Sequence, residues 1–371
     1  MNSARNTYNK SLHFVVLCIV FKPIYNVINY FFVLHSICIF IPIMYVDNYC
    51  KIKSFFRHLK GLSVVVFCFF ISCNTSTHPK PADLEEFPLD YISFESLFFD
   101  DLDTPLEDIK VQFPFFFPSQ TPDAVWLEKR SDSLQQLLFD ATKSIPKNNL
   151  KSRITRVLQY ANYYFPDEKL PQTAISLLTD VDYSLRAVDA DNMLLLSIDT
   201  YLGIDHPLYE GIPAYVKNKL TLDHLEAEII DALAPRFVSA PSGRTFLDQI
   251  VHHGKRLLLH DYLAPAMEDH QHIQYTAAQW EWANTHEAEV WRYFIDNQFL
   301  FSTDENLPFR FLLSSPYSKF YSYLDVDSPG RIGQWIGYQM LKKYQKRTGE
   351  TLQEILAASP QEILKKSKYN P

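Results

Sequence analysis

Apolar residues recur at helical spacing through most of the chain between residues 123 and 349, and few architectures other than packed helices accommodate such a pattern. Each stretch places apolar residues three and four positions apart, as one face of an amphipathic helix requires. The stretches are DAVWLEKRSDSLQQLLFDATKS, NLKSRITRVLQYANYYF, LDHLEAEIIDALAPRF, RTFLDQIVHHGKRLLLHDYL, TAAQWEWANTHEAEVWRYFIDNQF and GRIGQWIGYQMLKKYQKRTG.

One interval, residues 170–201, departs from this pattern. TAISLLTDVDY and NMLLLSIDTYL are apolar over lengths typical of strands, and RAVDAD between them suits a turn or a short third strand. Near the end, Thr351 with Glu354 predicts a capping box, and Ser359 followed by Pro360 predicts a second helix start. We therefore expect a predominantly helical α+β fold with a small sheet around residues 170–201.

Composition excludes several classes of protein. All five cysteines lie at or before Cys73, so the remainder has neither an internal disulfide nor a thiolate nucleophile or ligand. Only nine glycines occur, which disfavours barrels and glycine-rich phosphate loops. Residues 1–73 hold seven of the 35 basic residues and one of the 43 acidic ones, so the rest carries a net charge of −14. That charge argues against nucleic acid as a partner.

The region before Cys73 has the order of an export signal. An apolar run over 61–71 follows the basic residues Lys51, Lys53, Arg57 and Lys60. Phe70-Ile71-Ser72-Cys73 resembles the bacterial lipobox, with Phe70 where leucine is usual. We expect Cys73 to be lipidated and to anchor the protein in a membrane.

The expected organisation follows from this signal. Residues 44–72, beginning at Met44, form a lipoprotein signal peptide of ordinary length. Residues 1–43 are then an overcalled start or, alternatively, a genuine extra hydrophobic segment. A polar tether over 73–90 should lead to a single domain over 91–371.

The histidines raise the question of zinc. A helical zinc-protease site needs two histidines four residues apart with a glutamate beside the first. Neither THEAEVW nor DQIVHHGK supplies that pair, and His253 and His260 are about 10 Å apart along a helix. We expect no metal site, and histidines on helix surfaces or flanks, namely His252, His253, His260, His270, His272 and His286.

Other candidate groups have simpler structural interpretations. No Gly-x-Ser-x-Gly motif marks a serine hydrolase. Asp199 and Asp205 could act as a carboxylate pair, but a role in turns and caps, with Gly203 supplying the backbone conformation, is favoured.

The sequence SPGRIGQWIGYQ places two glycines on one helix face. Gly333 and Gly337 are four residues apart, which predicts close packing against another helix, with Pro329-Gly330 forming the turn before it. Arg331 could contact an anion, although a surface position is favoured.

Together these stretches resemble GldB, a gliding-motility lipoprotein family of Bacteroidetes. The resemblance covers roughly residues 90–345. It rests on the lipobox and on FPFFFPSQTPDAVW, YANYYFPDEKLPQTAISLLTDVDYSLRAV, MLLLSIDTYLGIDHPLYEGIPAYV, HHGKRLLLHDYLAP, YTAAQWEWANTHEAEVWRYFIDNQFLFSTD and SPGRIGQWIGYQML.

The resemblance implies a lipoprotein of the cell envelope that serves gliding motility and type IX secretion. We expect it to act without catalysis, by binding proteins of that apparatus. The resemblance supplies no catalytic residue and no cofactor. Acidic residues first appear after the cysteine at Asp83, so we expect the periplasmic face of the outer membrane.

A more distant similarity links the chain to predicted zinc peptidases. Their paired histidines would lie in the helix at 245–263, where this chain has Asp248 and Gln249, or Gln249 and Ile250. This similarity implies a peptidase-like scaffold that has lost its metal. The alternative function is a metal-dependent hydrolase with a non-standard site.

Overall fold

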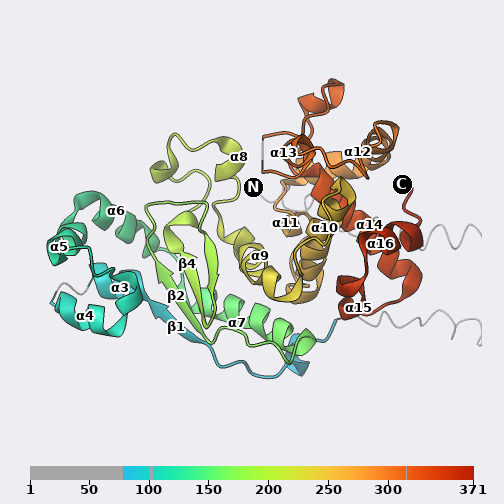
Figure 1. Cartoon of the computed structure of the whole chain (residues 1–371). Coiled ribbons are helices and arrows are strands. Elements are labelled where there is room, and N and C mark those ends of the chain that lie inside the picture. Colours follow the sequence, from blue (N-terminus) through green and yellow to red (C-terminus); the bar gives the residue numbers. More distant parts are fainter. Residues whose placement is uncertain (1–77, 101–102, 315) are drawn as a thin grey trace, which may run out of the picture. The chain divides into compact units, whose positions relative to one another are not determined.

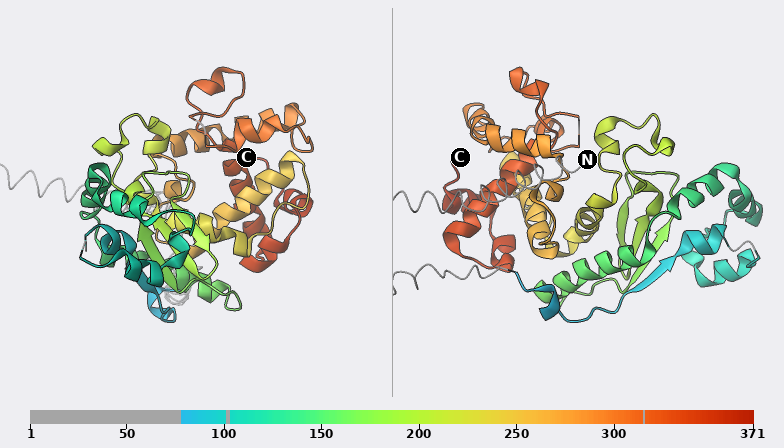
Figure 2. Two further views of the ribbon diagram at one scale, coloured as in Figure 1. Left: turned by 60° about the vertical axis from the view of Figure 1, so that its left-hand side comes forward. Right: turned by 180° about the vertical axis from the view of Figure 1, so that it is seen from behind.

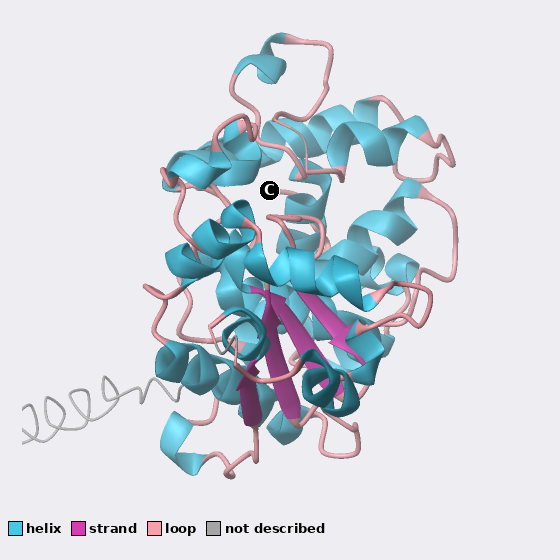
Figure 3. Cartoon of the chain, turned by 90° about the vertical axis from the view of Figure 1, so that its left-hand side faces the viewer, coloured by secondary structure: helices cyan, strands magenta, loops and turns pink. Residues whose placement is uncertain are grey.

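The computed structural model describes residues 78–100, 103–314 and 316–371 (Figure 1). They belong to one structural unit, Ser76–Pro371. The expected divisions at residues 43 and 72, together with Cys73, lie outside the described residues. The fold of the described part is predominantly helical with one small sheet, which confirms the predicted α+β class (Figure 3).

A four-stranded mixed sheet lies inside the unit. Its strands stand in the order β1 (Asp90–Ser93), β2 (Thr173–Leu177), β4 (Met193–Ser197) and β3 (Ala187–Ala190). β2 pairs in parallel with β1 and β4, and β3 is antiparallel to β4. The sheet expected at 170–201 is confirmed, and RAVDAD, for which a turn or a short third strand was considered, contains β3. The sequence analysis missed β1, which is only four residues long.

Several helices connect β1 to β2. They are α3 (Phe94–Phe99), α4 (Leu106–Gln112), α5 (Asp123–Ser131), α6 (Ser133–Thr142) and α7 (Lys147–Tyr164). The helical pattern over 123–144 divides into α5 and α6. The reason is Asp132, whose carboxylate accepts hydrogen bonds of 2.9 Å from the backbone N–H groups of Leu134 and Gln135 and so starts a new helix.

The remaining helices follow the sheet in the chain. They are α8 (Ala214–Lys217), α9 (Leu225–Phe237), α10 (Phe246–Leu263), α11 (Asp269–His272), α12 (Ala277–Asp296), α13 (Asn306–Phe311), α14 (Ile332–Thr348), α15 (Leu352–Ala357) and α16 (Pro360–Ser367). The predicted caps at Thr351 and Ser359 are confirmed. Helix α9 lies between the sheet and α10, while α3–α6 lie on the other side of the sheet (Figures 1 and 2).

The closest helix contact joins α10 and α14. A Cβ atom added at Gly337 would lie 1.9 Å from the carbonyl oxygen of Ile250, and one at Gly254 would lie 2.5 Å from the carbonyl carbon of Gly337. A Cβ at Gly333 would meet Leu312 Cδ2 at 2.8 Å. The predicted close packing of the Gly333–Gly337 face is therefore confirmed, and the partner at Gly337 is α10.

The segment before β1 packs against the domain, although residues 73–90 were expected to form a tether. Leu84 and Leu89 belong to the core, and the Tyr160 hydroxyl donates to the Pro79 carbonyl at 3.2 Å. The segment packs because the transfer of the Leu84 and Leu89 side chains from water into the core is favourable. Over the described ranges, no helix has the length and apolar character needed to cross a membrane.

Candidate functional site

The histidines singled out in the sequence do not converge on one point. His252 Nδ1 lies 3.2 Å from the Ser239 carbonyl oxygen, and His286 Nδ1 lies 2.9 Å from that of Trp282. His270 Nδ1 is 3.4 Å from the Glu268 carboxylate. Within the described ranges, no three His, Cys, Asp or Glu side chains are grouped so that they could hold a metal ion.

Two of these histidines are buried, so a surface position is wrong for them. His260 is 0% exposed and His272 is 5% exposed, because α9 and α11 pack on that flank of α10. Their ring centroids are 6.1 Å apart. His272 Nδ1 lies 2.6 Å from Asp261 Oδ1, and the Tyr338 hydroxyl donates to the same oxygen at 2.6 Å.

The carboxylates considered for catalysis stabilise backbone instead. Asp199 is buried and accepts hydrogen bonds from the N–H groups of Thr179 (3.1 Å) and Val181 (2.8 Å), where Val181 has a left-handed φ of 59°. Burial raises the pKa of the Asp199 carboxyl group. Asp205 is exposed, so the two do not form a catalytic pair. Asp248 caps α10 through the backbone N–H and hydroxyl of Thr245.

A cavity of about 360 Å³ with several charged side chains in its lining lies near the sheet. Arg186 comes from the loop between β2 and β3, Lys219 follows α8, and Arg331 precedes α14. Glu228 and Asp231 on α9 and Gln274 after α11 complete the charged and polar lining. Arg331, for which a surface position was favoured, is only partly exposed and lines this cavity.

Ion pairs and hydrogen bonds fix part of this lining. Arg186 forms an ion pair with Glu228, and its Nη1 donates to the Lys219 carbonyl oxygen at 2.8 Å. Gln274 Nε2 donates to the Glu228 carboxylate. Arg331 Nη2 donates to the carbonyl oxygen of Ile273. The result is a preorganised site in which three cationic groups face two carboxylates.

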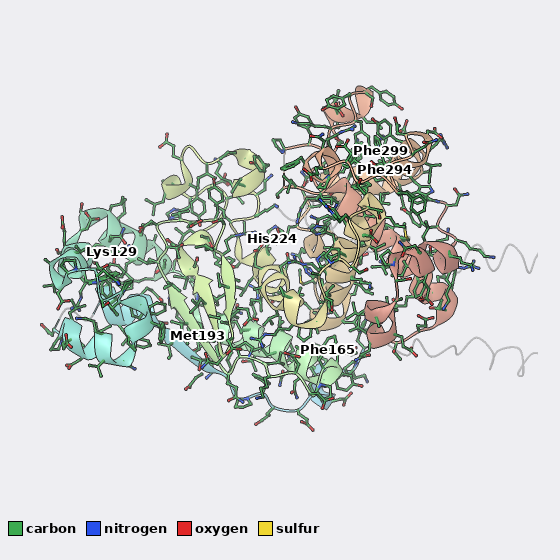
Figure 4. The ribbon with its side chains drawn as sticks, viewed as in Figure 1. Lys129, Phe165, Met193, His224, Phe294 and Phe299 are labelled. Atoms are coloured by element: carbon green, nitrogen blue, oxygen red, sulfur yellow. The ribbon has the colours of Figure 1, made fainter. Side chains whose placement is uncertain are left out.

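These cations affect the pKa of His224, the residue before α9, which is labelled in Figure 4. Burial, followed by the positive charges of Arg186, Lys219 and Arg331, lowers the pKa of the His224 imidazole to about 4. His224 is therefore neutral at physiological pH and adds no charge to the region.

A second, larger groove lies where the described chain begins. Its volume is about 1060 Å³, and His78 and α14 contribute to its walls. The His78 ring lies 5.0 Å from that of Tyr262. Charged residues of both signs line the groove, namely the basic Lys342, Lys343, Lys346 and Arg347 of α14 and the acidic Asp261, Glu287 and Glu350.

An exposed apolar loop extends from the region of α12 and α13, whose packed aromatic residues include Phe294 and Phe299 (Figures 1 and 4). We call residues 317–327 the η7 loop, after the short helix Tyr323–Val326. Tyr321, Tyr323 and Val326 are 76%, 72% and 80% exposed. The loop is nevertheless well anchored: Phe320 is buried, and the Asp325 carboxylate accepts from the N–H groups of Phe320 and Tyr321.

Sequence reasoning found only part of these sites. Arg331 was considered as an anion contact, but Arg186 and Lys219 carry no local signal and are brought to it by the tertiary fold. The η7 loop was missed, although the run FYSYLDV places aromatic residues in a non-helical stretch bounded by serine and proline.

Comparison with known protein families gives a match. A family model described as gliding motility protein GldB (GldB_lipo) matches residues 75–371, a range that includes all the described residues. Searches of curated proteins and of solved structures gave no match. Because the family match covers well over half of the sequence, the chain belongs to the GldB family of gliding-motility proteins.

Proposed function

We propose that the protein is a lipid-anchored component of the cell envelope that binds proteins of the gliding-motility and type IX secretion apparatus without catalysing a reaction. The observation that carries this proposal is the family match over residues 75–371. The anchor would be Cys73, and the location would be the periplasmic face of the outer membrane.

The start of the described chain is compatible with such an anchor. His78 follows Cys73 by five positions, and five residues span at most about 18 Å. A lipid on Cys73 would therefore keep the groove at His78, and with it the basic side chains of α14, near the headgroups. Lysine and arginine side chains are attracted to anionic membrane surfaces.

The η7 loop is the surface that best suits a protein partner. Aromatic residues are enriched in the energetically important centres of protein interfaces. Here Tyr321 and Tyr323 are exposed, while bonds from Asp325, Ser318 and Ser328 hold the loop in place. An ordered apolar loop loses little conformational entropy when it binds.

The non-enzymatic part of the proposal is supported by what the candidate catalytic groups already do. Asp199 holds the loop after β2, Asp248 caps α10, and His272 pairs with Asp261. For the alternative, a metal-dependent hydrolase, the described residues offer no grouped set of ligands.

Crosslinking in native envelopes tests the proposal. Full-length protein carrying Tyr321→Ser, Tyr323→Ser and Val326→Ser should lose crosslinked proteins that the wild type captures. The control carries Val111→Ser, Leu134→Ser and Leu137→Ser, which are 74%, 56% and 53% exposed on other helices. It should capture the same proteins as the wild type. If the η7 variant retains them all, the loop is not the binding surface.

A further inference from the structure

The cavity beside the sheet contains more positive charge than its carboxylates balance. Glu228 is paired with Arg186, and Asp231 lies 3.3 Å from Arg256, which is outside the cavity. Within the described ranges, Lys219 and Arg331 have no carboxylate at ion-pair distance. The polar contact of Lys219 Nζ is the neutral hydroxyl of Ser314, and that of Arg331 is the Ile273 carbonyl group.

Placing these two partly buried cations close together without an opposite charge between them is unfavourable. Burial lowers the pKa of Lys219 well below its usual value, and the charges of Arg331 and Arg186 lower it further, while Glu228 and Asp231 offset only part of this effect. Burial also lowers the pKa of Arg331. A buried charge costs free energy unless an opposite charge or hydrogen bonds compensate it. An anion between Lys219 and Arg331 would provide that compensation.

The backbone of the lining gives independent support. Gln274 and Arg331 both have left-handed backbone conformations, with φ values of 55° and 62°. The left-handed conformation at Gln274 ends α11, and the one at Arg331 precedes the first turn of α14. Here they place the two side chains at the cavity. The parallel strands β2 and β4 also end beside it, at the sheet edge where α/β folds bind ligands.

We propose that this cavity binds a small ligand through a carboxylate or phosphate group held by Lys219 and Arg331. Its volume of about 360 Å³ is near the lower end for small-molecule sites and is too small for a folded partner. The inference concerns a different surface from the η7 loop and does not depend on the proposed function.

Anion titrations of the full-length protein in non-ionic detergent test this inference. Inorganic phosphate and acetate are titrated separately, with sodium chloride at equal ionic strength as the reference, and the melting temperature is followed. At least one of the two anions should raise the melting temperature above the chloride reference, and the increase should saturate with anion concentration. A response to phosphate alone assigns a phosphate ligand, and a response to acetate alone assigns a carboxylate. If neither anion exceeds chloride, the inference is wrong.

Variants then locate the site. Lys219→Met and Arg331→Gln should each weaken the effective anion by about tenfold or more, whereas Arg244→Gln, at a side chain that is 86% exposed, should leave the affinity unchanged. Without anion, Lys219→Met should melt no lower than the wild type, because it removes an uncompensated buried charge. If Arg331→Gln does not fold, Lys219→Met decides alone. Wild-type affinity in Lys219→Met would overturn the assignment.

Discussion

Individual residues near the cavity show how tertiary structure sets the charge of a side chain. His224 is 7% exposed and faces a region in which Arg186, Lys219 and Arg331 are all positive. Protonating His224 would add a fourth positive charge to a site that is already desolvated. The folded state therefore binds this proton more weakly than the unfolded chain does.

This difference predicts a pH dependence of stability. The pKa of His224 is about 4 in the folded state and 6.5 for the free side chain, so the unfolded state binds more protons between these values. Stability therefore falls as the pH falls through this window. By linkage, the loss at pH 5 relative to pH 7.5 is about 2 kcal/mol. Urea unfolding at both pH values measures this loss of unfolding free energy. In His224→Gln the loss should be smaller than in the wild type by that amount. An unchanged difference would contradict the account.

At the scale of elements, the contact between α10 and α14 organises the helical part of the domain. Gly254 and Gly337 allow the two backbones to touch, since neither side offers a Cβ atom. The facing surfaces are otherwise large and buried, with Ile250, Ile336 and Tyr338 at most 1% exposed. A close crossing of this kind tolerates little change in volume.

Gly337→Ala tests this helix crossing, because helix propensity and packing predict opposite signs for its effect on the free energy of unfolding. Helix propensity alone would stabilise the variant by about 1 kcal/mol. The added Cβ would lie 1.9 Å from the Ile250 carbonyl oxygen, so the helices must separate. With an overpacking cost of about 3 kcal/mol, the upper end of the usual range, we expect a net loss of about 2 kcal/mol. Lys346→Ala, on the exposed face of α14, should change stability little. Equal or greater stability of Gly337→Ala in urea unfolding would refute the crossing.

The sequence predicted elements better than it predicted their assembly. The helices have strong periodicity, and the spacing of Gly333 and Gly337 indicated a close contact. The break at Asp132 had a signal that was overlooked, because Gln135 three residues later completes a capping-box pattern. The strand β1 is too short for a periodicity to show.

At the scale of the whole molecule, the described unit presents three separate surfaces. The larger groove adjoins the start of the described chain at His78, the η7 loop extends near α13, and the cationic cavity lies beside the sheet. The cavity could not be predicted because Arg186, Lys219 and Arg331 come from distant parts of the sequence. Only the fold brings them together.

We propose that the protein acts from a lipid anchor at Cys73, and fatty-acid labelling tests this proposal most directly. Cells expressing the full-length protein are fed an alkynyl fatty acid, and the purified protein is assayed for label. The wild type should be labelled and fractionate with membranes. Cys73→Ser should lose the label, because a hydroxyl cannot replace the thiol in diacylglyceryl transfer, whereas the control Cys68→Ser should keep it. An unlabelled wild type, or a Cys73→Ser protein labelled as strongly as the wild type, would contradict the account.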